Sequence, residues 1–185
     1  MTAGRSERPV GITILSVLHV IGGVLGVLVF AFALTKLNDP QIKSGFDAVG
    51  IPYPLFLIGI GFLSVLALAA GIAMWLGTKW GWYLGSFYYA YSIATNLTAL
   101  FSIGGVLSSF PDELGANHAP GPGQFYAKFG VRLVISILIY LYFFKQNVRE
   151  YFGLQNTNKW AAIAIQFAVC IGIAIASTLA ASAGS

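Results

Sequence analysis

Long runs of apolar residues, separated by short polar segments, dominate the chain. Five of these runs reach the length of about 20 residues that a helix needs to cross the hydrocarbon layer of a bilayer. The runs are continuous and do not alternate between apolar and polar positions, which favours helices over the strands of a membrane barrel. The pattern therefore predicts transmembrane helices at residues 10–34, 55–76, 80–107, 125–144 and 160–183.

A short amphipathic segment follows the first run. Pro40 suits the first turn of a helix, and Ile42, Phe46 and Val49 recur after it at helical spacing. We expect a helix that lies on the membrane surface at about residues 40–49, with a solvated loop as the alternative.

The remaining connections differ in length. Thr78 and Lys79 leave room only for a tight turn, so the second and third helices are expected to be antiparallel neighbours. Residues 108–124 contain several Pro and Gly and are expected to form an outer loop. Gly153 is expected to end an extension of the fourth helix beyond the membrane.

Composition supports a membrane protein and excludes several other classes. Of the 185 residues, 57% are hydrophobic and 9% are charged, whereas roughly a quarter of the residues in a soluble domain are charged. Aromatic residues make up 15% of the chain, which excludes disorder. One Cys and two His exclude a disulfide framework and a zinc module. We therefore expect one all-α domain over residues 1–185, a polytopic membrane helix bundle.

Positive residues are biased toward one side of the predicted bundle. With five helices, the amino terminus, the turn at Lys79 and the 145–159 loop share a side, which carries Arg5, Arg8, Lys79, Lys145, Arg149 and Lys159. The other side carries Lys36, Lys43 and Lys128, together with Arg132 inside the helix end. Positive loops tend to stay in the cytoplasm, so the amino terminus is expected inside and the carboxyl terminus outside. Four residues near Lys79 predict an aromatic girdle at the inner interface: Trp75, Trp80, Trp82 and Tyr83.

An alternative interpretation treats the first run as a signal peptide. Arg5 and Arg8 resemble a basic leader, and residues 31–33 offer an A-x-A cleavage site. The apolar run is longer than the roughly 7–15 residues of a signal peptide, which favours a retained helix. The net charge of +4 is spread along the membrane margins. It favours contact with anionic lipid head groups and gives no patch suited to nucleic acid.

Two short segments resemble a known group of proteins. They are RPVGITIL at residues 8–15, followed by IGG at 21–23, and YFFKQNVREYFG at 142–153. The first segment resembles the start of a loose group of small uncharacterised membrane proteins of bacteria and archaea. The second resembles the end of the last conserved helix in the same group. The resemblance implies a multi-pass protein of a prokaryotic inner membrane and implies no catalytic residue. The fifth predicted helix follows the end of the matching part.

Small residues recur at helical spacing in two helices. Transmembrane helices use such residues to bring their backbones close together. In the first helix Gly22 and Gly26 form a GxxxG pair, and a seam at spacings of three and four runs through Ser16, His19, Gly23, Gly26, Phe30 and Ala33. The fifth helix carries a ridge formed by Ala164, Ala168, Gly172, Ala176 and Ala180. This fifth-helix ridge packs either inside the bundle or against another subunit. We expect a homo-oligomer or a larger membrane complex.

Three polar residues lie in the inner half of the predicted apolar layer. At about 1.5 Å per residue, His19, Ser136 and Gln166 are all roughly 9–13 Å from the inner boundary. One interpretation is a proton relay or a polar substrate site, and the other is a set of hydrogen bonds that join helices. The second is favoured because no carboxylate accompanies His19. Haem ligation is disfavoured because the second histidine, His118, falls in the outer loop.

The third helix carries a polar face. Its members are Tyr88, Ser92, Thr95, Asn96, Ala99 and Ser102. The face either lines a narrow polar path or forms dry hydrogen bonds with neighbouring helices, with Ser64 as a candidate partner of Asn96. Arg132, near the outer surface, either extends toward water or pairs with Asp112 or Glu113.

These features predict a protein without catalytic activity. All six carboxylates lie outside the apolar runs, so the apolar layer holds no acid–base pair, and no phosphate-binding Gly-rich loop is present. We expect no catalytic residue, cofactor or metal. The favoured function is a small structural or accessory subunit that associates through its small-residue helix faces. The alternative is an oligomeric channel or carrier for a small solute or ion that uses the polar face of the third helix.

Overall fold

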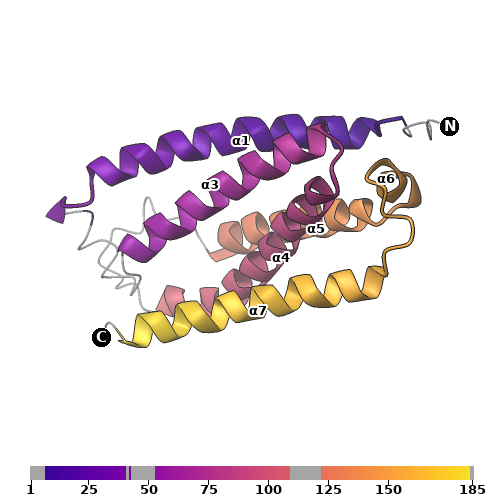
Figure 1. The fold of residues 1–185 in the computed structure, drawn as a ribbon. Coiled ribbons are helices and arrows are strands. Elements are labelled where there is room, and N and C mark those ends of the chain that lie inside the picture. Colours follow the sequence, from indigo (N-terminus) through magenta and orange to yellow (C-terminus); the bar gives the residue numbers. More distant parts are fainter. Residues whose placement is uncertain (1–6, 41, 43–52, 109–121, 184–185) are drawn as a thin grey trace.

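The computed structural model describes residues 7–40, 42, 53–108 and 122–183 (Figure 1). Within these residues the secondary structure is entirely helical, which confirms the expected all-α class. The six helices are α1 (Val10–Thr35), α3 (Tyr53–Trp75), α4 (Lys79–Ser108), α5 (Pro122–Phe143), α6 (Gln146–Tyr151) and α7 (Lys159–Ala183).

The long helices form a bundle with α4 at its centre. Helix α1 pairs with α3, and α4 packs against α3, α5 and α7. Figure 1 shows α1 along one side of the bundle and α7 along the other, with the two ends of the chain at opposite ends of the bundle. Successive long helices run in alternating directions along the bundle (Figure 1).

Four helices of the described chain are long and apolar enough to cross a membrane: Val10–Thr35, Phe56–Trp75, Tyr126–Phe143 and Lys159–Ala176. Large apolar side chains such as Leu28, Ile58 and Leu138 are each more than 60% exposed on the outside of the bundle. A soluble monomer rarely exposes such a surface. The chain is therefore a multi-pass membrane protein whose helices contact the lipid bilayer.

Helix α4 does not belong to this apolar set, although its 30 residues make it the longest helix described. Its hydropathy is lowered by its Trp and Tyr residues and by the Ser, Thr and Asn residues of the polar face. Because α4 contacts three other helices, a large part of its surface faces protein and not lipid. A central helix can therefore be less apolar than its neighbours.

The connections differ in part from the prediction. Pro40 and Ile42 are helical, and the rest of the predicted surface helix at 40–49 lies outside the described residues. Most of the predicted outer loop, residues 109–121, also lies outside them. Helix α5 begins at Pro122, three residues before the predicted start at 125, because proline is well suited to the first helical position. Gly77, with a φ of 64°, forms the tight turn between α3 and α4.

The extension of the fourth predicted helix is a separate helix. Lys145 adopts an extended conformation, with φ of −63° and ψ of 146°, and this breaks the chain between α5 and α6. The expectation of one continuous helix was therefore wrong. Gly153 follows α6 with a φ of 66°, as expected for a residue that ends a helix.

The main core lies at the end of the bundle where α1 begins and α6 is located. It contains Ile12, Trp82, Phe143 and Tyr151 among its buried residues. Trp82 is 1% exposed and its Nε1–H donates to the Phe143 carbonyl at 2.7 Å. Its assignment to the aromatic girdle was wrong, since the indole packs into the core and satisfies its donor there. The girdle residues Trp75 and Trp80 are exposed.

The two segments that carry the sequence resemblance meet in this core. The Arg8 Nε donates to the Tyr151 hydroxyl at 3.0 Å, and its Nη2 donates to the Trp75 carbonyl at 2.7 Å. The Arg8 guanidinium also lies 4.4 Å from the centre of the Trp75 ring, a cation–π contact. Residues 8–15 and 142–153, far apart in the sequence, therefore form one packing unit.

Candidate functional site

The predicted cluster of His19, Ser136 and Gln166 does not assemble. Each of these residues is buried, but each has different neighbours. Gln166 interacts with α4 and α5, Ser136 interacts with α4 only, and His19 contacts tyrosine rings of α4. The sequence places the three residues at one depth but does not place them on facing sides of their helices.

Gln166 joins three helices through a network of hydrogen bonds. Its Nε2 donates to the Ser86 hydroxyl at 2.6 Å, and its Oε1 accepts from the Tyr140 hydroxyl at 2.9 Å. Ser86 in turn donates to the Trp82 carbonyl at 2.6 Å. Both ends of the amide are satisfied and Gln166 is 5% exposed. This network holds α7 against α4 and α5.

Ser92, Asn96 and Ser136 form a second polar group between α4 and α5. The hydroxyl oxygens of Ser92 and Ser136 are 2.8 Å apart. The Asn96 Nδ2 donates to the Ser92 carbonyl at 2.6 Å and reaches the Ser92 hydroxyl at 3.2 Å. The expected pairing of Asn96 with Ser64 does not occur, since Ser64 donates to the Ile60 carbonyl of its own helix at 2.7 Å.

A cavity of about 650 Å³ opens along the polar face of α4. Four residues of the predicted face line it: Tyr88, Ser92, Thr95 and Asn96. Helix α5 contributes Ser136 and Arg132 to the same cavity. Ala99 does not line it, and the side chain of Ser102 lies outside the described part of the structure. The polar face is thus open to a cavity over about two helical turns and is not fully covered by its neighbours.

Among the described residues that line this cavity, Arg132 is the only cation. Its side chain is exposed, and the described residues provide it with no ion pair or hydrogen bond. Asp112 and Glu113, the partners considered from the sequence, lie outside the described residues. A guanidinium beside hydroxyl and amide groups forms a positive, hydrogen-bonding surface that suits an anionic or strongly polar solute.

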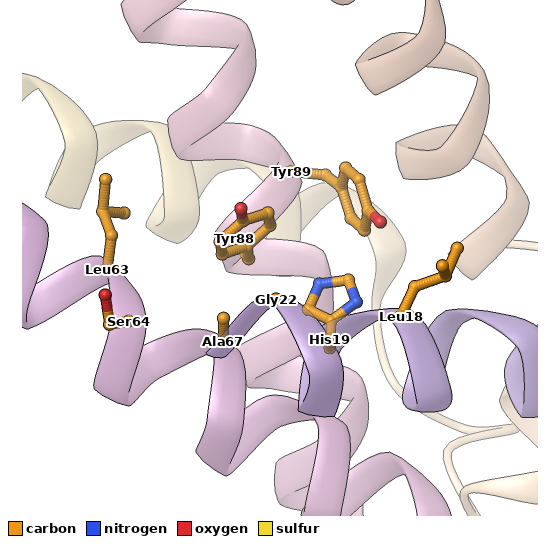
Figure 2. A pocket seen from close by; sticks show the side chains of 8 residues that line it. All are labelled: Leu18, His19, Gly22, Leu63, Ser64, Ala67, Tyr88 and Tyr89. Carbon is orange, nitrogen blue, oxygen red and sulfur yellow. The ribbon is translucent and has the colours of Figure 1, made fainter. Parts of the chain in front are cut away.

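His19 lies in an adjoining cavity of about 300 Å³ between α1, α3 and α4. Figure 2 shows its imidazole pointing from α1 toward Tyr88 and Tyr89. The centre of the His19 ring lies 4.8 Å from the centre of the Tyr88 ring and 5.3 Å from that of the Tyr89 ring, and both contacts have edge-to-face geometry. The two cavities share Leu63, Tyr88 and Tyr89 as lining residues. Sequence reasoning missed the role of Tyr89, which lies next to the predicted polar face and not on it.

The small residues of α1 divide into two groups. A Cβ on Gly23 would come within 2.6 Å of the Leu68 backbone nitrogen, and a Cβ on Gly26 would collide with Ser64, so both glycines face α3. Gly22 is exposed, and a Cβ there would meet nothing within 4 Å. The close contact between α1 and α3 therefore depends on Gly23 and Gly26, and Gly22 has no part in it.

The fifth-helix ridge points away from the rest of the bundle. Ala164, Ala168, Gly172 and Ala176 are exposed, whereas Ala162, Gln166 and Cys170 are buried on the opposite face of α7. The side chain of Ala180 lies outside the described residues. The sequence left open whether the ridge packs inside the bundle or against another subunit. For these four residues, packing inside the bundle is therefore excluded.

The described residues contain no group of three or more His, Cys, Asp and Glu side chains arranged to hold a metal ion. Comparison with known proteins finds no family model, no curated protein and no solved structure that matches this chain.

Proposed function

We propose that this protein is a non-enzymatic membrane carrier that binds a small polar solute in the cavity along α4. One observation carries the proposal: the polar face of α4 lines a cavity of about 650 Å³ whose wall also includes Arg132. The volume falls in the range of roughly 300–1,000 Å³ that is typical of small-ligand sites. Ionisable groups within membrane segments commonly face water-filled cavities and mark solute pathways.

The charge of the cavity favours an anionic solute. Arg132 has no ion pair among the described residues, while Ser92, Asn96 and Thr95 add hydrogen-bonding groups beside it. A carboxylate or phosphate group would form charge-assisted hydrogen bonds with the planar guanidinium, which is the strong class of hydrogen bond.

The proposed carrier crosses the membrane five times, with the amino terminus inside and the carboxyl terminus outside. Two observations support five crossings: α4 is 30 residues long, and the chain ends lie at opposite ends of the bundle (Figure 1). The excess of Lys and Arg on the side of Lys79 supports the orientation. The resemblance at residues 8–15 and 142–153 supports a prokaryotic inner membrane.

Cysteine labelling tests whether the cavity contains water. In a Cys170→Ala background, Thr95→Cys places a thiol on the cavity wall and Leu97→Cys places one on the outer surface of the same helix. A thiol must ionise to react, and it does so in water but not in lipid. A membrane-impermeant methanethiosulfonate should therefore modify Thr95→Cys on the order of tenfold faster than Leu97→Cys. The measurement is the modification rate in sealed vesicles, from each side in turn.

The two positions are two residues apart, so they share the same depth and differ in the direction they face. Equal rates at both positions would contradict a water-filled cavity and with it the carrier proposal. Protection of Thr95→Cys by an anion such as phosphate or a carboxylate, with no effect on Leu97→Cys, would identify the solute class.

A second candidate function, an accessory subunit in a larger membrane complex, is supported by the position of the fifth-helix ridge. Gly172 on this ridge is exposed, with nothing within 4 Å of a Cβ placed there. Gly172→Leu should prevent close helix approach by a partner, and we expect it to abolish the oligomer or complex on mild-detergent native gels. Ala174→Leu is the control, because it adds similar bulk at an exposed position about 160° around the helix axis from Gly172. An unchanged complex in Gly172→Leu would contradict a role for the ridge in assembly.

A further inference from the structure

The imidazole of His19 has one satisfied and one unsatisfied nitrogen. Its Nδ1 lies 2.8 Å from the Leu15 carbonyl oxygen. A carbonyl only accepts hydrogen bonds, so Nδ1 carries the hydrogen of the neutral ring and Nε2 is left as a bare acceptor. Nε2 is buried and has no hydrogen-bond partner in the described part of the protein. The side chain as a whole is 5% exposed.

An acceptor in this position needs a donor from outside the bundle. Buried polar groups in proteins are nearly always paired, and the described residues supply no partner for this nitrogen. The nearby hydroxyls belong to Ser64, which donates to Ile60, and to Tyr88 and Tyr89, neither of which bonds to Nε2. The site therefore lacks a hydrogen-bond donor for the Nε2 of His19.

The surroundings of His19 indicate what kind of molecule brings that donor. The cavity of about 300 Å³ is bordered by Leu18 and Gly22, which are both exposed on the outer surface of α1. That surface faces lipid, so a ligand reaches the cavity from the bilayer and must be lipid-soluble. The inner wall is formed by the two tyrosine rings shown in Figure 2, which favour packing against another aromatic ring.

We infer that this cavity binds a lipid-soluble phenol of the quinol class, whose hydroxyl donates a hydrogen bond to the Nε2 of His19. In the structure the two tyrosine rings cover the imidazole, so a ligand reaches Nε2 only if the side chain of Tyr88 rotates away. Tyr88 also lines the larger cavity, which provides space for that movement. The quinol site adjoins the solute site at Arg132 and shares Tyr88 with it, but the inference does not depend on the protein being a carrier.

Nitrogen NMR of the full chain in lipid tests this inference directly. Protein carrying His118→Asn, so that His19 is the only histidine, is placed in bilayer discs of phosphatidylethanolamine and phosphatidylglycerol. The probes are a decyl-substituted hydroquinone kept reduced, the matching quinone, which has no donor, and decanol, which has a donor but no ring. We expect the hydroquinone to move the Nε2 signal, and the other two probes to leave it in place.

His19→Phe removes the acceptor but keeps an aromatic ring against Tyr88 and Tyr89. Loss of one hydrogen bond should weaken hydroquinone binding by about five- to tenfold in calorimetric titration. Unchanged affinity in this variant, or equal Nε2 shifts with hydroquinone and quinone, would overturn the inference. An equal shift with decanol would overturn the aromatic ligand class. The NMR measurement uses the native histidine, so it decides the matter even if His19→Phe does not fold.

Discussion

Gly23→Val is expected to separate α1 from α3 and to lower the free energy of unfolding by at least about 3 kcal/mol, the upper end for overpacking a tight contact. A Cβ at position 23 would meet the backbone nitrogen and Cα of Leu68 at 2.6 and 2.8 Å. These are main-chain atoms of a helix, so they cannot turn aside as a flexible side chain would. The measurement is chemical unfolding in detergent, followed by tryptophan fluorescence.

Gly22→Val is the matched control. It makes the same substitution one residue earlier in the same helix, where a Cβ meets nothing within 4 Å. Its expected effect is within about 0.5 kcal/mol, as for most surface substitutions. If Gly22→Val were as destabilising as Gly23→Val, the facing surfaces of α1 and α3 would have to be rotated by about one residue, or roughly 100°.

Hydropathy alone predicts the helices well, because a transmembrane helix must be both long and apolar. The bounds of the first, second, third and fifth predicted spans agree within two residues with those of helices α1, α3, α4 and α7, as with 10–34 against Val10–Thr35. The break at Lys145 was not predictable from composition, since residues 146–151 are helical whether they continue α5 or form a separate helix. The difference lies in one backbone conformation, which depends on how α6 packs into the core.

Rotation about each helix axis is the part that the sequence leaves undetermined. Counting residues gives the depth of His19, Ser136 and Gln166, but the sides that face one another depend on packing. The GxxxG pair shows the same limit, because Gly26 faces α3 but Gly22 does not; the predicted seam, by contrast, correctly placed Gly23 and Gly26 on one face. For Tyr88, Ser92, Thr95 and Asn96 of the polar face of α4, the spacing alone was sufficient, because these residues recur on one side of a single helix.

Residue type also misleads where a polar or amphipathic side chain has a partner in the core. Trp82 has the composition and position of an interfacial aromatic, but the Phe143 carbonyl at the broken end of α5 accepts its N–H. Arg149 counts as one positive charge in the orientation argument, yet it is 8% exposed and has a structural role. Both partners are main-chain carbonyls, which no sequence pattern reveals.

Arg149→Met is the second substitution for which a large effect is expected. Three carbonyl oxygens lie within hydrogen-bond distance of the Arg149 Nη2: Leu154 at 3.0 Å, Gln155 at 2.8 Å and Thr157 at 2.6 Å. Together these contacts shape the connection between α6 and α7. Hydrogen bonds from a charged donor contribute roughly 1.5–3 kcal/mol each, so we expect a loss of at least about 3 kcal/mol and a loosened loop. Thermal unfolding and the rate of proteolysis within residues 154–158 are the measurements.

Lys145→Met provides the control, since it removes a positive charge at the other end of the same short helix. Lys145 is exposed and lies 5.6 Å from the Tyr142 ring centre, a contact of about 0.5–1 kcal/mol at an exposed site. Arg149→Lys keeps the charge but loses the planar fork, and should fall between the two because an ammonium group cannot match the same three acceptors. If Arg149→Met and Lys145→Met lowered the stability and the resistance to protease equally, the loss of a positive charge alone would explain the effect. In that case the α6–α7 connection would not depend on the guanidinium, and α7 would be held to the bundle chiefly by the Gln166 network.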